Sequence, residues 1–392
     1  MNETIARLGR RLRLGVIGGG PGSFVGPVHR IAARIDDNYE LVASVLSSDP
    51  ERARANGRAL GIAADRAYGS AEAMFAGESQ RPDGMEVVAI MTPNDSHHAL
   101  AVAALEHGLD VICDKPLTTN MGDALDLVTR VHDTGLVFCT TFNYSGFPLV
   151  RQARAMIRDG DLGEIRMVHV QYIQGYNYVL SGDEERGNAD NWRLRPERVG
   201  PSTVLGDIGS HAWHLASFVT GMQFDRLMAD VTAVVPGRKS DDYAGILFRL
   251  ENGAAGNMWI TQAGAGAVHG LCFRVFGTKG GLEWFEEEPN RLTQQRPGQP
   301  ALLFERGGPG LKPEAERAQR TYMGHPEGFH EAFAVLYADV AKAVVARRLK
   351  QPLSTADRDF PTVEDGARAV RFMEASLESS RTKSWVDCRL KM

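Results

Sequence analysis

Apolar residues in the first part of the chain come in short runs that alternate with helical segments. The runs Leu12–Ile17, Tyr39–Leu46 and Met85–Met91 are typical of strands, and the last is nearly all apolar, as a strand buried on both faces should be. Helices are predicted between them at His29–Ile35 and Ala99–Glu106. Further strands are predicted over Leu109–Cys113 and Leu136–Thr141. This alternation predicts a parallel α/β sheet.

The pattern changes in the second part of the chain. A helix is predicted over Leu149–Arg158, and strand-like segments then dominate. These segments are Arg166–Gln174, Leu227–Val235, Tyr243–Leu250, Ala254–Thr261 and Leu271–Phe276. Asn252-Gly253 between two of them predicts a hairpin turn. We expect one large antiparallel or mixed sheet, loop excursions over Glu286–Pro313, and closing helices at Phe329–Arg347 and Val363–Leu377.

Length and composition fit two globular domains. The chain has 392 residues, 43% hydrophobic and 24% charged, so each half can bury a core of its own. We divide it into a first domain over residues 1–144 and a second over residues 145–392. The net charge of −5 argues against a nucleic-acid partner or an anionic membrane surface. No apolar run reaches membrane-spanning length.

The cysteines and the first residues bear on the compartment. Cys113, Cys139, Cys272 and Cys388 include no closely spaced pair, so neither a CxxC metal site nor a redox motif is predicted. The basic residues up to Arg13 are followed by no apolar segment of the kind that a secretory signal contains. A reducing cytoplasm is therefore the expected location.

A glycine cluster follows the first strand. The segment Gly18–Ser23 reads Gly-x-Gly-x-x-Ser, close to the turn in which dinucleotide-binding folds bring a pyrophosphate to a helix N-terminus. Glycine is needed there for a tight turn and for close approach of the backbone. A plain glycine-rich turn is the alternative, but the strand before it and the helix after it favour a cofactor site.

The end of the second strand bears on the choice of cofactor. An acidic side chain there would bind the ribose 2′-hydroxyl of NAD, but the chain has Ser47 and Ser48. Serine does not repel a 2′-phosphate, and Arg52 lies one turn further on. Asp49, just before Pro50, fits a helix cap better than a ribose ligand. Both NAD and NADP therefore stay open, with NAD the first choice.

Two further groups of residues could carry chemistry. Lys115 follows a buried strand at the edge where α/β sheets bind ligands, and could polarise an alcohol or carbonyl oxygen; a surface lysine is the alternative. Asp207, His211 and His214 are spaced i, i+4 and i+7, so they would share one face of a helix. Histidine can shuttle protons near neutral pH, and a neighbouring Asp would orient it.

Two alternatives compete for the Asp207 group. One is a helix cap followed by core histidines, and the other is a zinc site built from the carboxylate and imidazoles. No further cluster of metal-ligating residues is evident in the sequence, so we expect no metal.

These residues give the chain a resemblance to a known family. From about Leu12 to Ser380 it resembles the glucose–fructose oxidoreductase, inositol dehydrogenase and MocA family. The glycine turn, Thr92–His97, Asp114-Lys115-Pro116 and Gly206–His211 carry the resemblance. It implies an α/β fold: an N-terminal Rossmann domain, then an α+β domain with a large, mostly antiparallel sheet. An extended sheet with one exposed face needs cover, so we also expect a homodimer or homotetramer.

The resemblance implies roles for individual residues. Lys115, Asp207 and His211 would be catalytic, with His211 as the proton acceptor or donor. The residues expected along the dinucleotide are Gly18, Gly20, Pro21, Gly22, Ser23, Phe24, Ser47, Thr92, Pro93, Asn94, His97, Asp114, Lys115, Asn143, Trp192 and Arg193. Those expected around the substrate are Lys115, Arg193, Asp207, His211, His214, Tyr243 and His325.

Three departures from the family pattern bear on these roles. Asp114 replaces the usual Glu and is one methylene shorter, so its contact should be lost or shifted. His214 stands where many members carry Asp, which weakens any transfer of inositol specificity. The loop Pro21–Val25 is longer than usual, and we expect it to reshape the pyrophosphate site or to reach a neighbouring subunit.

The expected activity is hydride transfer between a nicotinamide and a secondary alcohol or ketone of a sugar, sugar derivative or inositol, within carbohydrate metabolism. One alternative is an NAD-dependent glycoside hydrolase that oxidises its sugar transiently. Another is a non-catalytic dinucleotide-binding sensor. Lys115 and His211 argue against the sensor, because a sensor needs no proton shuttle.

Overall fold

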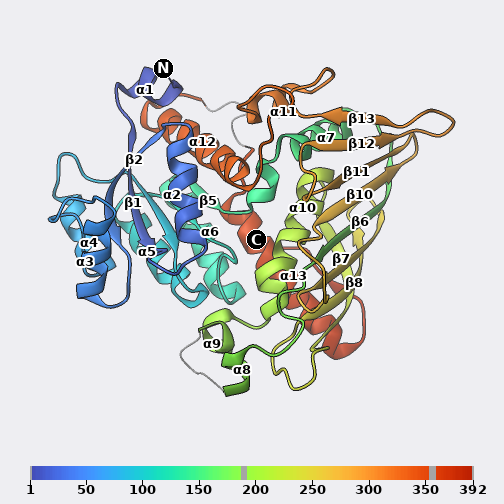
Figure 1. The fold of residues 1–392 in the computed structure, drawn as a ribbon, viewed down its shortest axis with the longest axis horizontal. Helices are drawn as coiled ribbons and strands as arrows, with labels where there is room; N and C mark the ends of the chain where they lie inside the picture. Colours follow the sequence, from blue (N-terminus) through green and yellow to red (C-terminus); the bar gives the residue numbers. More distant parts are fainter. Residues whose placement is uncertain (1, 187–191, 353–358, 391–392) are drawn as a thin grey trace. The chain divides into compact units, whose positions relative to one another are not determined.

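A computed structural model describes residues 2–186, 192–352 and 359–390 of the chain (Figure 1). The chain forms two compact units. Unit 1 comprises the chain up to Thr118, Gly122–Asn143 and Phe333–Gly366; unit 2 comprises Thr119–Met121, Tyr144–Ala332 and the chain from Ala367. The passage from Asn143 to Tyr144 lies next to the boundary expected at residue 144, and the later segment Phe333–Gly366 rejoins unit 1.

Unit 1 is built on a five-stranded parallel sheet with the order β2-β1-β3-β4-β5. The strands are β1 Leu12–Gly18, β2 Tyr39–Val45, β3 Val87–Met91, β4 Asp110–Cys113 and β5 Phe138–Thr140. The helices are α1 Glu3–Leu8, α2 Val25–Ile35, α3 Pro50–Ala59, α4 Ala71–Ser79, α5 His97–Glu106, α6 Met121–Thr134 and, from Phe333, α12 Phe329–Arg348. Strands β3 and β4 are buried along their whole length, as a sheet covered on both faces requires.

The predicted strands of unit 1 are all present, within one to two residues at most ends. Helix α2 begins at Val25, four residues before the predicted start, because Gly26 and Pro27 look like a loop in the sequence. Proline is tolerated in the first turn of a helix, where its missing N–H has no partner to lose. Helices α1, α4 and α6 were not predicted.

Unit 2 is built on a nine-stranded sheet with the order β13-β12-β11-β10-β6-β9-β8-β7-β14, which Figure 1 shows on the right. The strands are β6 Ile165–Ile173, β7 Phe224–Thr232, β8 Tyr243–Leu250, β9 Ala255–Thr261, β10 Cys272–Gly277, β11 Gly281–Phe285, β12 Arg291–Gln295, β13 Leu302–Glu305 and β14 Val386–Asp387. Strands β6 and β9 pair in parallel, and all other neighbours are antiparallel. The predicted mostly antiparallel sheet is confirmed.

The helices of unit 2 are α7 Pro148–Arg158, α8 Gly182–Arg186, α9 Pro196–Val199, α10 Ser210–Thr220, α11 Pro313–Ala318 and, from Ala367, α13 Val363–Thr382. Helices α7 and α10 pack against the sheet, and α11 packs on α7. Trp213 of α10 stacks on Phe372 of α13 at 6.1 Å between ring centroids, and Phe224 stacks on Phe248 at 4.2 Å. These aromatic side chains form the core between helices and sheet.

One prediction for unit 2 is wrong and another is confirmed. The segment Glu286–Pro313 is not only loop, because it contains the strands β12 and β13. The Arg, Thr and Gln content of β12 hides it, and β13 is only four residues long. Pairing of β12 with β11 and of β13 with β12 holds them in the sheet. The hairpin at Asn252-Gly253 is present: Gly253 has a φ of +86° and its N–H donates to the Leu250 carbonyl over 2.8 Å.

The outer face of the nine-stranded sheet carries large apolar side chains. Along β8, Ala244 and Ile246 are buried while Leu247 is half-exposed, as the alternation of a strand requires. The outer apolar side chains on successive strands, each between 37% and 54% exposed, are Met228, Leu247, Trp259, Met167, Phe276 and Phe285. Met228 pairs with Leu247, and Met167 with Phe276, across neighbouring strands. The same face also carries the polar pairs His169–Asn257 and Arg274–Glu283, and we call it the outer sheet face.

The described residues were considered for a membrane-spanning helix, a metal site and the state of the cysteines. None of the helices described is long and apolar enough to cross a membrane. Among the same residues, no group of three or more His, Cys, Asp or Glu side chains could hold a metal ion. Cys113, Cys139, Cys272 and Cys388 are all buried as free thiols.

A buried carboxylate links several segments of unit 1. Glu86, whose side chain is 3% exposed, accepts two hydrogen bonds from Arg10 at 2.7 and 2.8 Å and one from the backbone N–H of Arg13. The guanidinium of Arg348 on α12 lies 2.9 Å away. Burial by itself would raise the pKa of Glu86, but the hydrogen bonds and positive charges of Arg10, Arg13 and Arg348 lower it overall.

We therefore expect Glu86→Gln to lower the free energy of unfolding by about 1.5–3 kcal/mol at neutral pH. Because the pKa of Glu86 is lowered from 4.5 in the folded chain, this stabilisation is present above pH 4.5 and is lost as the pH falls through the folded value. Urea titrations from neutral pH down to about pH 3 measure it, and the gap between wild type and variant should shrink with acid.

Glu3→Gln is the matched control, because Glu3 pairs with Arg7 at an exposed position. That change should alter stability by less than about 0.5 kcal/mol. A gap for Glu86→Gln that stays constant from neutral to acid pH would show that the carboxylate charge is not the source of the stabilisation.

Candidate functional site

The glycine turn leaves no room for side chains where β1 ends. A Cβ atom at Gly20 would lie 2.1 Å from the Leu46 carbonyl oxygen, and one at Gly18 would lie 2.5 Å from the Met91 carbonyl oxygen. Gly18 also has a φ of +82°, a backbone conformation that other residues rarely adopt. The turn is therefore a bare backbone cradle at the carboxyl ends of β1, β2 and β3.

A third glycine completes the turn at an unexpected position. The sequence has Ser23 where the third glycine of the fingerprint would stand, but a Cβ atom at Gly26 would lie only 2.1 Å from the Gly19 carbonyl oxygen. Gly26 thus allows the close packing of helix on turn that the third glycine normally gives. Ser23 instead accepts a hydrogen bond from the Gly26 N–H over 3.2 Å. The third glycine therefore stands three residues later in the chain than the fingerprint predicts.

The residues between these glycines lie at the surface. Pro21 and Gly22 are exposed, and the Phe24 side chain is 76% exposed just before the first turn of α2. The Phe24 side chain makes no cap, and the Ser23 hydroxyl takes only the Gly26 N–H in the first turn of α2. The helix therefore presents backbone N–H groups beside the glycine turn, the arrangement that binds phosphate groups in dinucleotide folds.

The hydroxyl of Ser47 and the carboxylate of Asp49 organise the chain just after β2. Asp49 accepts a hydrogen bond from the Arg52 N–H over 2.7 Å and caps α3, so its prediction as a helix cap is confirmed. The hydroxyl oxygen of Ser47 accepts from the Asp49 N–H and, over 2.9 Å, from the guanidinium of Arg52. Ser47 and Arg52 thus form a hydrogen-bonded pair at the strand end.

His97 joins two turns at the carboxyl edge of the sheet. Its side chain is fully buried, and its two ring nitrogens lie 2.9 Å from the carbonyl oxygens of Thr92 and Pro116. Ser96 donates to the Thr92 hydroxyl and the Pro93 carbonyl. Asn94, 9% exposed, begins the short 3₁₀ turn between them. His97 therefore supports the Thr92–Asn94 turn and the segment that carries Lys115 from behind.

Asp114 and Asn143 flank the same edge. Asp114 accepts hydrogen bonds from the Lys115 N–H over 2.9 Å and from the Thr141 hydroxyl over 2.8 Å, so the shorter carboxylate is held by the segment after β5. The Lys115–Pro116 peptide bond is cis. Asn143 is 2% exposed, and its side-chain nitrogen has no hydrogen-bond partner among the residues described. A buried amide in that condition indicates a place for a ligand.

The catalytic residues predicted in unit 2 are Asp207, within a π-helical turn, and His211, in the helix that follows it. This turn, Leu205–Gly209, leads directly into α10 at Ser210. Such turns are rare and frequent at functional sites. They place Asp207 and His211 differently from the regular α-helical spacing on which our expectation rested. His211 is 7% exposed and His214 is 3% exposed.

Asp207 is held by two side chains that the sequence did not indicate. Its carboxylate accepts hydrogen bonds from the Tyr176 hydroxyl over 3.1 Å and from the Gln262 amide over 2.5 Å. Partial burial and the negative charge of Asp207 raise the pKa of Tyr176. Tyr176 therefore keeps its proton and donates a hydrogen bond to the carboxylate of Asp207, which holds that carboxylate in place.

Arg193 also lies in the electrostatic surroundings of this group. Its guanidinium stacks on the Trp192 ring at 4.7 Å in the 3₁₀ turn Trp192–Leu194. The positive charge of Arg193 acts on Tyr176 in the direction opposite to that of Asp207. The structure thus brings Arg193 and Asp207 to one region of unit 2.

Tyr243 lies elsewhere and is corrected here. A Cβ atom at Gly209 would lie 3.1 Å from Ile260, whose cross-strand neighbour is Ala244, so the π turn sits on the face that Ala244 shares. Neighbouring residues of a strand point to opposite faces. Tyr243 therefore lies on the outer sheet face, over Gly245, and we do not place it among the substrate residues.

His325 lies on an exposed loop. Its carbonyl oxygen accepts hydrogen bonds from Arg306 and from the Thr321 hydroxyl. Arg306 is itself buried and paired with Glu327 at 3.0 Å. The described contacts of His325 are therefore those of its backbone, and they shape the loop before α12.

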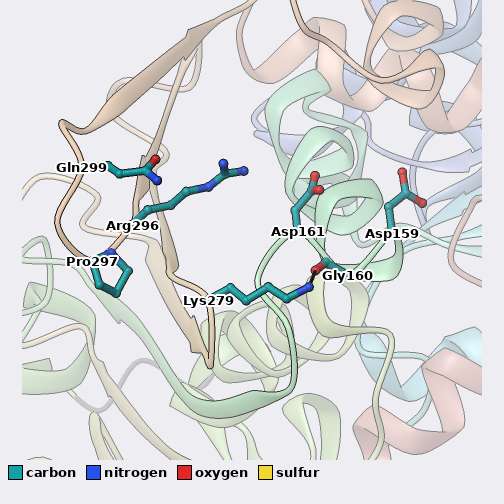
Figure 2. Close-up of a pocket in the computed structure, with 7 residues that line it drawn as sticks. All are labelled: Asp159, Gly160, Asp161, Lys279, Arg296, Pro297 and Gln299. Carbon is teal, nitrogen blue, oxygen red and sulfur yellow. Dashed lines mark hydrogen bonds between the residues drawn. The ribbon is translucent and has the colours of Figure 1, made fainter.

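A separate hollow of about 450 Å³ lies on unit 2, and Figure 2 shows its lining. The residues are Asp159, Gly160, Asp161, Lys279, Arg296, Pro297 and Gln299. The carboxylates of Asp159 and Asp161 are 2.8 and 3.6 Å from the ammonium group of Lys312. None of the predicted site residues lines this hollow, so it is an ionic surface feature apart from the site.

Comparison with known proteins agrees with this geometry. Residues 12–142 match the model of the oxidoreductase family with an NAD-binding Rossmann fold, and residues 150–283 match the GFO/IDH/MocA C-terminal domain. The chain is 35% identical to the uncharacterized oxidoreductase YfiI of Bacillus subtilis, over 97% of this chain and 98% of that protein. It is 26% identical to a levoglucosan dehydrogenase of Pseudarthrobacter phenanthrenivorans, over 96% and 98% of the two chains.

Solved structures of similar proteins share the fold of this chain over nearly its whole length. An inositol dehydrogenase homolog from Azotobacter vinelandii, complexed with NAD+, superposes with a TM-score of 0.91 at 37% identity, covering 99% of this chain and 100% of that one. The structure of an inositol dehydrogenase homolog from the same organism with NADH and myo-inositol gives 0.88 at 38% identity, covering 96% and 98%. The chain belongs to the GFO/IDH/MocA family of oxidoreductases, with an NAD-binding Rossmann domain followed by the family's C-terminal domain.

Proposed function

We propose that this enzyme transfers a hydride between NAD and a secondary alcohol or ketone of a sugar, sugar derivative or inositol. The observation that carries the proposal is the group at the π turn, where a buried histidine, His211, follows a carboxylate held by Tyr176 and Gln262. The similar proteins named above include an inositol dehydrogenase homolog with myo-inositol and a levoglucosan dehydrogenase, which supports a hydroxyl-rich substrate.

The residues of unit 1 fit a dinucleotide. The bare turn at Gly18–Gly20 and the N-terminus of α2 beside it suit a pyrophosphate, and the buried Asn143 side-chain nitrogen has no hydrogen-bond partner among the described residues. We propose that Thr92, Pro93 and Asn94 lie along the cofactor and that His97 supports them. When bound, NAD supplies the hydride acceptor or donor, and the protein supplies position and proton transfer.

Ser47 is the residue of interest for cofactor choice. It stands at the end of β2 without a carboxylate, and Arg52 already donates to its hydroxyl. An acidic residue there favours NAD, whereas a nearby arginine accommodates the 2′-phosphate of NADP. We therefore propose that the enzyme tolerates NADP beside NAD.

The proposed roles of the catalytic residues follow from their chemistry. In the oxidation direction, His211 accepts the proton of the substrate hydroxyl, and the Lys115 ammonium stabilises the negative charge that develops on its oxygen. Asp207 does not need to accept a proton, because Tyr176 and Gln262 both donate hydrogen bonds to it and favour its ionised form. Its charge then favours a protonated His211.

The outer sheet face supports a homo-oligomer. Large apolar side chains on six neighbouring strands are between 37% and 54% exposed, and exposed apolar side chains gathered on one face mark interaction surfaces. We propose that this face packs against a second copy of the chain.

The activity assay follows absorbance of reduced nicotinamide with NAD and NADP separately, across inositols, aldoses, anhydrosugars and glycosides. We expect net reduction with at least one polyol. Lys115→Ala and His211→Ala should each lower kcat/KM by roughly 10²–10⁴-fold. His107→Ala, at an exposed histidine at the end of α5, is the matched control and should have no effect.

Release of product from a glycoside without net reduction would overturn the dehydrogenase in favour of a redox-neutral hydrolase. Bound cofactor without any reaction, together with unchanged cofactor binding in both variants, would favour a sensor.

Gly20→Ala tests the cofactor cradle. A Cβ atom 2.1 Å from a backbone oxygen must displace the backbone, so we expect affinity for NADH to fall roughly tenfold or more. Quenching of intrinsic fluorescence or calorimetry measures it without any substrate. Gly328→Ala is the control, because a Cβ atom there meets nothing within 4 Å. Equal NADH affinity in the two variants would show that the cofactor does not use this turn.

Leu247→Lys tests the outer sheet face. Leu247 is 53% exposed in the middle of that face, and a buried unpaired ammonium in an interface is costly, so the molar mass in sedimentation should fall toward that of a single chain. Val268→Lys, at an 83% exposed side chain outside the strands, should leave it unchanged. An assembly that survives Leu247→Lys would place its interface elsewhere.

A further inference from the structure

A chain of four polar side chains in unit 2 leads to the proposed proton acceptor. The hydroxyl groups of Tyr144 and Tyr172 lie 2.6 Å apart, and the Nε2 atom of His269 lies 2.8 Å from the Tyr172 hydroxyl and 3.1 Å from that of Tyr144. On its other side, the Nδ1 atom of His269 lies 2.9 Å from the carboxylate of Glu286. We call these four residues the tyrosine relay.

The relay ends on His211. The rings of Tyr144 and His211 meet edge to face, with 4.8 Å between centroids and an interplanar angle of 78°. The ring of Tyr172 lies 6.5 Å from the same imidazole. Tyr144 and Tyr172 are 4% and 3% exposed, whereas the side chains of His269 and Glu286 are 23% and 14% exposed. The relay thus runs from a partly exposed imidazole and carboxylate to the buried imidazole of His211.

The two hydroxyl groups of the relay both have an acceptor. Burial raises the pKa of both tyrosines, so each keeps one proton to donate. His269 Nε2 accepts from one tyrosine, and the oxygen of that tyrosine accepts from the other. In either order the protons point toward His269, whose Nδ1 atom faces the Glu286 carboxylate.

The loop around His269 is held by a further carboxylate. The carboxylate of Glu287 accepts hydrogen bonds from the N–H groups of His269 and Gly270, at 2.9 and 3.2 Å. The amide of Gln174 donates weakly to the Tyr172 hydroxyl over 3.4 Å. These contacts join one imidazole and two hydroxyl groups in a single polar network.

We propose that the tyrosine relay positions His211 and sets its basicity for proton transfer. Tyr144 acts through ring contact with the imidazole, and Tyr172, His269 and Glu286 act as positioning residues by fixing Tyr144. The titratable groups that unit 2 places around His211 are Asp207 and His214 on its own segment and the two tyrosines opposite. The charges of both Asp207 and Glu286 reach Tyr144. The inference rests on the proposed function, in which His211 takes the substrate proton.

Steady-state kinetics of Tyr144→Phe and Glu286→Gln test the positioning role. We expect kcat to fall roughly tenfold in each, with KM within about twofold, because the substrate is still bound but the proton acceptor is misplaced. The double variant should be no slower than either single one, since both changes break the same relay. Unchanged kcat in Tyr144→Phe, or independent effects that multiply in the double variant, would overturn the proposal.

Tyr39→Phe is the matched control, because it also removes a buried tyrosine hydroxyl with a hydrogen bond, here 2.8 Å to the Tyr337 carbonyl in unit 1. It should leave kcat unchanged. Circular dichroism and NADH affinity establish that each variant is folded, and Tyr172→Phe gives a second break in the relay if Tyr144→Phe does not fold.

A second readout needs no substrate. The imidazole resonances of a protein labelled in histidine, with His211→Gln for assignment, report the pKa of His211 directly. Loss of the Glu286 charge in Glu286→Gln should lower that pKa, and Glu288→Gln, an exposed neighbour, should leave it unchanged. No shift in Glu286→Gln would overturn the relay even if the enzyme is active. A shift without any dehydrogenase activity would retain the relay and overturn the proposed function instead.

Discussion

Unit 1 depends on one constraint. Backbone segments approach each other very closely at the carboxyl edge of the parallel sheet. The carbonyl oxygens of Leu46, Met91 and Gly19 occupy the positions where side chains at Gly20, Gly18 and Gly26 would begin. Only glycine fits, and the chain therefore turns tightly enough for α2 to start beside the ends of three strands. The same crowding leaves backbone N–H groups facing outward, which is the chemistry that a pyrophosphate requires.

Much of this could be predicted from the sequence, because the signals are local. Strand β8 was predicted at Tyr243–Leu250 without error, since its apolar and polar residues alternate cleanly. The cap at Asp49 and the hairpin at Asn252-Gly253 follow from the chemistry of single residues. Strands β12 and β13 were not predicted, because β12 is mostly polar and β13 has only four residues. They belong to the sheet through pairing of β12 with β11 and of β13 with β12. The role of Gly26 was not predicted, because this glycine lies three residues after the third position of the fingerprint.

The residues around the predicted catalytic group were harder to find for a different reason. Asp207 and His211 stand in a recognisable motif, but Tyr176 and Gln262, which hold the carboxylate, come from segments 31 and 55 residues away. Tyr144 and His269 are 125 residues apart and meet at one hydrogen bond. No pattern along the chain marks such partners, since each tyrosine or glutamine alone is an ordinary core or loop residue. The alternation of β8 did, however, contain the information that Tyr243 faces away.

The parallel pair at the centre of the second sheet has a consequence for how this unit folds. Met167 on β6 pairs with Ala255 on β9, 88 residues later, whereas β7–β8–β9 and β10–β11–β12–β13 are meanders of antiparallel neighbours. Local hairpins close small loops and form quickly, while the β6–β9 contact must first close a large one. The two meanders can therefore exist before the seam between them, and until that seam forms each presents an open edge strand. An unpaired strand edge can pair with another chain, so a chain in which the seam is still open is exposed to aggregation.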